Sequence, residues 1–110
     1  MGACDFELIK IGHYKSAQDA FYEATREALF EHGRSTTELT KVICAADLPR
    51  PGTKAWKKYI KDTQSAIPQW ECYALEIRRG KYFDALKESV YGKKRKRNLK
   101  AYLLLGLTAC

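Results

Sequence analysis

The most apolar stretch of the chain, residues 99–109, constrains the fold more than any other segment. It follows Asn98 and contains the run A-Y-L-L-L-G-L-T-A. A nearly unbroken apolar run of this length is typical of a strand that is buried on both of its faces. We therefore expect it to form a central strand of a sheet, with the rest of the chain built around it.

The length of the chain leaves room for one hydrophobic core. Domains much shorter than 100 residues struggle to bury enough apolar surface, so 110 residues are expected to form a single domain spanning 1–110. Hydrophobic residues make up 45% of the chain and aromatic residues 12%, which is unlike the composition of disordered proteins. We expect the chain to fold on its own.

The first half of the chain has a strand, a helix and a second strand. Residues 5–11, D-F-E-L-I-K-I, nearly alternate between polar and apolar residues, as strands do. Ser16 and Asp19 form an S-x-x-D start signal for a helix over residues 17–32, with Gly33 as its stop. Residues 36–45 are rich in β-branched residues and end at a turn region, which predicts the second strand.

The second half continues the alternation. A helix begins at Thr53, and Pro68 separates it from Q-W-E-C-Y-A-L-E-I-R-R, a segment that fits either a strand or a helix and that we interpret as a strand. A short helix over residues 81–91 ends at Gly92. The fold class is therefore α+β: about four strands in a mixed or antiparallel sheet, with two to three helices packed mainly on one face.

Each helix has a candidate buried face, defined by apolar or small residues at helical spacing. On the second helix the side chains of four lysines project away from that face. The candidate buried residues are Ala17, Ala20, Phe21, Ala24 and Ala28 on the first helix, Trp56, Tyr59, Ile60 and Thr63 on the second, and Phe83, Leu86 and Val90 on the third.

The sequence indicates a cytoplasmic protein. It has no apolar run of about 18 residues, and its first twenty residues carry five charged side chains where a signal peptide would need an apolar segment. The cysteines, Cys4, Cys44, Cys72 and Cys110, lie far apart in apolar surroundings. Because zinc sites use closely spaced ligand pairs, we interpret them as reduced and mostly buried thiols.

The sequence gives no basis for catalysis. His13 and His32 are the only histidines, and neither is paired locally with a nucleophile. Glu23, Glu27 and Glu31 share one side of the first helix, a pattern more typical of a solvated acidic face than of acid–base chemistry. No glycine-rich nucleotide-binding motif is present. We expect neither an enzyme nor a bound metal or cofactor.

The strongest local signal is the stretch of five consecutive cationic residues at 93–97, which we call the basic run. Its residues account for five of the seven excess positive charges of the chain. Adjacent cations repel one another, so a polyanion or an acidic protein surface is expected to compensate them. The run consists of Lys93, Lys94, Arg95, Lys96 and Arg97.

Other residues are candidates to extend this surface. Lys100 follows the run closely, and the second helix carries Lys54, Lys57, Lys58 and Lys61. If the run lies in a loop, these lysines could join it in one surface. Four aromatic residues could offer stacking to bases, although core positions suit them as well: Trp56, Tyr82, Tyr91 and Tyr102.

Two segments resemble a family of short uncharacterised proteins of bacteriophages and some prokaryotes. Residues 16–33, S-A-Q-D-A-F-Y-E-A-T-R-E-A-L-F-E-H-G, are similar to the A-x-x-A-F start and E-x-G end of that family's first helix. The final K-A-Y-L-L-L-G-L-T-A is similar to its last strand. After Gly33 the chain departs from the family's glycine-threonine turn. The resemblance implies a phage or mobile-element origin and carries no activity.

These observations favour a binding protein over an enzyme. The first hypothesis is a module that binds RNA, DNA or a ribonucleoprotein, with the basic run on phosphates and the helix lysines in support. The alternative is a virus-encoded inhibitor of a host defence protein, similar in kind to an anti-CRISPR protein, that acts through protein–protein contact.

Overall fold

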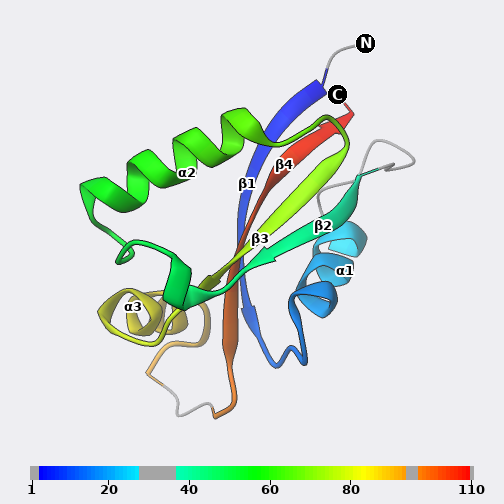
Figure 1. Ribbon diagram of the computed structural model, residues 1–110. Helices are drawn as coiled ribbons and strands as arrows, with labels where there is room; N and C mark the ends of the chain where they lie inside the picture. The colour runs from blue at the N-terminus through cyan, green and yellow to red at the C-terminus, as the bar shows by residue number, and fades with distance from the viewer. Residues whose placement is uncertain (1–2, 28–36, 94–96, 110) are drawn as a thin grey trace.

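Four strands form one mixed sheet in the order β1-β4-β3-β2 (Figure 1). The computed structural model describes residues 3–27, 37–93 and 97–109, with the side chains of 5–26, 37–93 and 97–106. The elements are, in chain order, β1 (Ala3–Gly12), α1 (Ala17–Glu27), β2 (Glu38–Ile43), the short 3-10 helix η1 (Ala45–Asp47), α2 (Lys54–Ala66), β3 (Glu71–Ile77), α3 (Lys81–Tyr91) and β4 (Lys100–Ala109).

The apolar final strand lies in the interior of the sheet, as predicted. β4 pairs antiparallel with β1 over its full length, from Gly12 opposite Lys100 to Ala3 opposite Ala109. On its other side it pairs antiparallel with β3, which pairs parallel with β2. Leu103, Leu104 and Leu105 are at most 1% exposed, because β4 is covered on both faces. The predicted α+β class with a small mixed sheet is confirmed.

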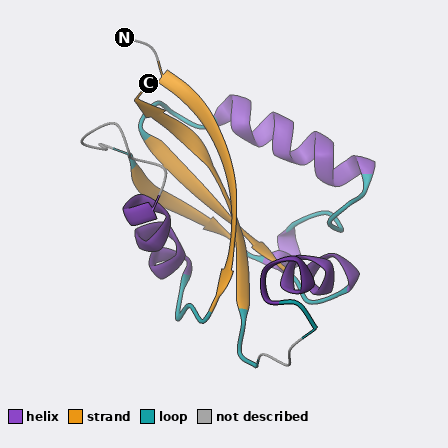
Figure 2. Cartoon of the chain, turned by 180° about the vertical axis from the view of Figure 1, so that it is seen from behind, coloured by secondary structure: helices purple, strands orange, loops and turns teal. Residues whose placement is uncertain are grey.

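The helices divide unequally between the two faces of the sheet. Figures 1 and 2 show α1 on one face and both α2 and α3 on the other. Small residues make the contact between α1 and β3: Ala20 and Ala24 of the helix pack in one cluster with Cys72 and Ala74 of the strand. Small side chains let the helix backbone approach the sheet closely. The predicted alanine stripe of the first helix is confirmed for Ala17, Ala20, Phe21 and Ala24.

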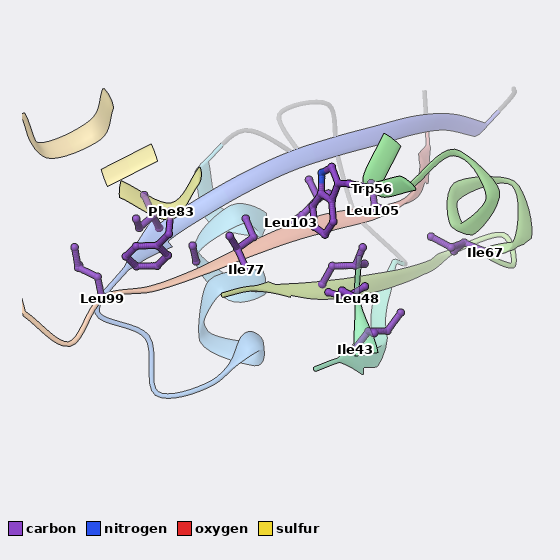
Figure 3. Close-up of a cluster of buried hydrophobic side chains, with 12 residues drawn as sticks. Ile43, Leu48, Trp56, Ile67, Ile77, Phe83, Leu99, Leu103 and Leu105 are labelled. Atoms are coloured by element: carbon purple, nitrogen blue, oxygen red, sulfur yellow. The ribbon is translucent and has the colours of Figure 1, made fainter. Parts of the chain in front are cut away.

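The larger core lies between the sheet and the pair α2 and α3 (Figure 3). Leu103 and Leu105 of β4 form its floor, and Trp56 of α2 and Phe83 of α3 cover it. Trp56 is the buried residue of α2, with Tyr59 and Ile60 packed beside it. The apolar side chains of this core therefore hold α2 and α3 against the sheet.

Local signals set the helix ends. The Thr53 hydroxyl caps α2 by accepting a hydrogen bond of 3.2 Å from the Trp56 N–H. Gly92 ends α3 with a φ of 69°, a left-handed conformation that glycine adopts without strain, and its N–H donates to the Glu88 carbonyl. At the start of α1 the Asp19 carboxylate accepts from the Lys15 backbone N–H at 2.9 Å. Every helix within the described residues is too short or too polar to cross a membrane.

The structure confirms one sequence-based prediction and contradicts another. The ambiguous segment after Pro68 is a strand, and its side chains alternate as expected: Leu75 and Ile77 lie in the larger core, and Cys72 and Ala74 in the smaller one. The assignment of Val90 to the buried face of α3 is wrong, since it is 58% exposed. Tyr91 packs in that turn instead and donates its hydroxyl to the Ile11 carbonyl.

Other predictions extend past the described residues. Residues 28–36 hold the predicted second half of the first helix, with Ala28, Glu31, His32 and Gly33. The glutamate stripe is therefore described at Glu23 only, and that carboxylate is bonded rather than freely solvated: it accepts from the Tyr14 hydroxyl and pairs with Lys10 at 3.2 Å.

Candidate functional site

The basic run connects α3 to β4 at one end of the sheet. Its two described residues, Lys93 and Arg97, are exposed, and 94–96 lie outside the described residues. The chain is held on both sides of the run, by the glycine that ends α3 and by Leu99, which is 3% exposed in the larger core. The flanking cations Lys93 and Arg97 are therefore attached to a packed scaffold.

Lys100 extends the positive charge from the run onto the sheet. It is exposed, and its Nζ donates a hydrogen bond of 3.2 Å to the backbone carbonyl of Lys15, in the loop that follows β1. The register of the sheet explains the contact, because Lys100 pairs with Gly12, the last residue of β1. The backbone of a second lysine, Lys15, therefore lies beside the Lys100 side chain.

Arg78 and Arg79 add two more cations at the same end, directly after β3. The Arg78 Nη2 donates to the Ala45 carbonyl at 2.9 Å, and the Arg79 guanidinium lies 5.7 Å from the centre of the Phe83 ring. Both arginines line a shallow pocket of about 420 Å³ together with Leu99, Lys100 and one acidic residue, Glu76. They therefore connect β3 with the segment that follows the basic run.

The same two arginines line a second pocket, of about 540 Å³, which we call the arginine pocket. Its walls come from the loop before α2 and from the connection between β3 and α3. Four of the seven residues that line it are cationic and none is acidic. The lining residues are Arg50, Pro51, Arg78, Arg79, Gly80, Lys81 and Tyr82.

These two pockets and the run together form what we call the basic end of the protein. Each of its cationic side chains is exposed, and together they come from three separate stretches of the chain: the loop before α2, the junction of β3 and α3, and the segment that leads into β4. The basic end consists of Arg50, Arg78, Arg79, Lys81, Lys93, Arg97 and Lys100.

The lysines of α2 lie in a different place. Lys57 and Lys61 line a cleft of about 630 Å³ between α2 and β1, opposite Asp5 and Glu7. Both lysines are exposed, and Trp56 lines the same cleft. Lys54 and Lys58 are exposed and are not among its lining residues. The carboxylates of β1 offset part of the charge of Lys57 and Lys61.

The helix lysines do not join the basic run in one continuous patch. Gln64, one turn after Lys61, bonds to Gly106, whereas Lys100 begins β4, so about 20 Å of strand separates the two positions. Figures 1 and 2 both show α2 and the start of β4 at different ends of the sheet, with α3 between them. Lys54, at the other end of α2, follows Pro51 of the arginine pocket by three residues in the sequence.

Of the four aromatic residues considered for stacking, Tyr82 is placed to reach a ligand in these pockets. It is partly exposed and lines both the arginine pocket and the α2–β1 cleft. Burial, and then the negative charge of Glu7, raise the pKa of its hydroxyl. Trp56 and Tyr102 are buried, at 4% and 3% exposure, and Tyr91 bonds to Ile11.

The described residues present few groups suited to catalysis. His13 is exposed in the turn after β1, and no three His, Cys, Asp or Glu side chains in the described part of the chain gather as metal ligands would. Cys72 is fully buried, and burial raises the pKa of its thiol to about 12. Cys44 is exposed, contrary to the expectation of mostly buried cysteines, and both are free thiols.

Four cations of the basic end are absent from the site predicted from the sequence: Arg50, Arg78, Arg79 and Lys81. A local signal was present: R-R-G-K stands directly before a helix, where glycine and cations often surround an anion. Arg50 is flanked by two prolines and carries no such signal. Its proximity to the R-R-G-K segment follows from the fold alone.

No protein-family model matches the chain, and no curated protein and no solved structure is significantly similar to it.

Proposed function

We propose that this protein is a non-enzymatic binding module for RNA or DNA, either free or within a ribonucleoprotein, and that it docks through the basic end. One observation carries the proposal: seven exposed cations from three stretches of chain lie at one end of the sheet, with Arg78 and Arg79 shared by two adjoining pockets.

The energetics of this arrangement favour a polyanionic partner. Like charges that are fixed on one surface repel each other, and the repulsion is relieved when a polyanion binds. A nucleic acid offers a line of phosphates and releases condensed counterions on binding, so its affinity falls steeply with salt. Arginine suits this task because its planar guanidinium can bond two phosphate oxygens at once.

The cations provide affinity more readily than sequence preference. Contacts to phosphates position a strand but do not distinguish its bases. Tyr82 is the aromatic group beside the basic end that can meet a base. We therefore expect binding with little sequence preference. Among the lysines of α2 we expect the main contribution from Lys54, which follows Pro51 of the arginine pocket by three residues.

The test measures binding of fluorescent single-stranded RNA and DNA by anisotropy between 50 and 200 mM salt. Lys93→Gln with Arg97→Gln should weaken binding and reduce the slope of log K against log salt by about 1.4, since each lost phosphate contact contributes about 0.7. Arg26→Gln with Lys41→Gln removes the same charge at two exposed positions outside the basic end and should leave the slope nearly unchanged.

A binding constant that ignores salt, or an equal loss in both double variants, would overturn the proposal. Affinity purification from cells that naturally make the protein, with and without nuclease, supplies the second test. Recovery of nucleic acid supports the proposal. A stoichiometric protein partner that survives nuclease treatment would replace it with the inhibitor hypothesis.

A further inference from the structure

The arginine pocket has the charge and the shape of a site for a single anionic group. It is a cavity of about 540 Å³, and its four cations enter from two sides: Arg50 from the loop before α2, and Arg78, Arg79 and Lys81 from the connection between β3 and α3. Tyr82 closes one side. With no carboxylate in the lining, nothing within the pocket offsets this charge.

The two arginines are held in position before any ligand arrives. Arg78 is anchored by its hydrogen bond to the Ala45 carbonyl and Arg79 by the Phe83 ring. A guanidinium has five N–H donors, so the single bond of Arg78 leaves others to meet a ligand. Since these side chains are already ordered, binding costs less side-chain entropy than it would on a freely solvated surface.

The backbone of α3 adds donors to the same pocket. Gly80 is the N-cap residue of this eleven-residue helix and makes no side-chain cap hydrogen bond. The N–H groups of a first helical turn have no partner within the helix, and the helix dipole places partial positive charge there. A Cβ at Gly80 would meet nothing within 4 Å, so the space beside the helix start is open.

We propose that the arginine pocket binds a phosphate group of a nucleic-acid strand. The inference rests on the proposed function for the source of the phosphate, while the recognition chemistry is that of any phosphate. The source can be the terminal phosphate of a strand or a phosphodiester within it. Arg50 and Lys81, from two different segments of the chain, would contact the phosphate, and the N–H groups at the start of α3 would donate to it.

The first experiment titrates the ¹⁵N-labelled protein with inorganic phosphate at constant ionic strength and follows amide chemical shifts by NMR. The amides of Gly80, Lys81 and Tyr82 should shift in a saturable manner, whereas chloride at the same ionic strength should leave them in place. Arg50→Gln with Lys81→Gln should abolish the shifts, and Arg26→Gln with Lys41→Gln should preserve them. Absence of saturable shifts in the unchanged protein overturns the phosphate site.

A second pair of variants guards against loss of folding. Gly80→Asp supplies a carboxylate that caps α3, so it should maintain stability while it competes with phosphate. Gly80→Asn caps the helix without a charge and should retain more phosphate binding. Equal phosphate affinity in the two folded variants contradicts the proposal.

The nucleic-acid arm compares strands of one sequence that carry a 5′-phosphate or a 5′-hydroxyl. Preference for the phosphorylated strand, lost in Arg50→Gln with Lys81→Gln, assigns the pocket to a terminal phosphate. Equal binding of the two strands, weakened about tenfold by the same variant, assigns it to an internal phosphate. If nucleic acid binds but this variant behaves like the Arg26 and Lys41 control, the pocket proposal fails and the proposed function stands. If phosphate binds but nucleic acid does not, the phosphate site stands and the proposed function fails.

Discussion

The side chain of Gln64 donates a hydrogen bond of 2.9 Å from its Nε2 to the backbone carbonyl of Gly106. The bond joins the last turns of α2 to β4, across 42 residues of sequence. Gln64 also lines the α2–β1 cleft. The residue that accepts it has no room for a side chain of its own.

Replacing Gly106 by alanine should destabilise the protein strongly. A Cβ at this position would lie 2.5 Å from the Glu71 carbonyl oxygen and 2.9 Å from Cζ of Phe6, and the first of these is backbone that cannot move aside easily. We expect the free energy of unfolding, measured by urea titration, to fall by about 2 kcal/mol or more. Gly80→Ala, where the space is open, should cost less than about 1 kcal/mol. Similar losses in both variants would contradict the close approach at Gly106.

Trp56 should be the main anchor of α2. It is 4% exposed, and its ring centre lies 6.3 Å from that of Tyr82 at the start of α3. Trp56→Ala should lower the free energy of unfolding by about 3–5 kcal/mol, because it leaves a large cavity in the core. Val90→Ala, at an exposed position of α3, should change it by less than about 1 kcal/mol. Thermal and urea unfolding followed by circular dichroism provide the comparison.

The pair Tyr14 and Glu23 should make stability depend on pH. The Tyr14 hydroxyl donates to the Glu23 carboxylate, and this bond, followed by the Lys10 contacts, lowers the pKa of Glu23 below its ordinary 4.5. A carboxyl with a lowered pKa stabilises the fold above its unfolded value, and that contribution is lost as pH falls through the folded value. Wild type should therefore exceed Tyr14→Phe in stability at pH 7, and the difference should shrink below pH 4.5.

Urea midpoints of the two proteins between pH 7 and pH 2.5 measure this effect. Tyr22→Phe is the matched control, because Tyr22 is 55% exposed and its change should leave the profile unaltered. A difference between wild type and Tyr14→Phe that stays constant over the whole range would show that the hydroxyl acts independently of the Glu23 charge.

The two described cysteines should differ sharply in reactivity. The thiolate is the reactive form, and burial raises the pKa of Cys72 to about 12 in a position that is fully buried. Cys44 is exposed between β2 and η1. Iodoacetamide at pH 8 should alkylate Cys44 in the native protein at least tenfold faster than Cys72, as peptide mass spectrometry can measure. Urea should abolish the difference, and equal native rates would contradict the burial of Cys72.

Local patterns in the sequence predicted most of the elements. The order of strands and helices, the limits of α3 at Lys81 and Tyr91, and the burial of β4 follow from periodicity, a glycine stop and apolar content. The segment Glu71–Ile77 was the ambiguous case, because Trp70, Tyr73, Ala74 and Ile77 fit a helical face as well as strand alternation. The segment is a strand because it pairs with both β2 and β4.

The candidate site was predicted only in part. The basic run and Lys100 can be recognised from the sequence because their cations lie close together along the chain. Lys100 lies where it can extend the run. The sequence interpretation assigned the supporting role to the α2 lysines, yet Lys57 and Lys61 face Asp5 and Glu7 across a cleft. The supporting cations at the basic end are instead Arg50, Arg78, Arg79 and Lys81.

The sequence by itself determined where most of the described strands and helices form and how much positive charge the chain carries, because both depend on residues close together along the chain. The tertiary structure alone decided which cations share a surface. The order β1-β4-β3-β2 brings the end of β3, the start of β4 and the loop before α2 to one end of the sheet. That order depends on contacts between residues far apart in the sequence, which no local pattern encodes.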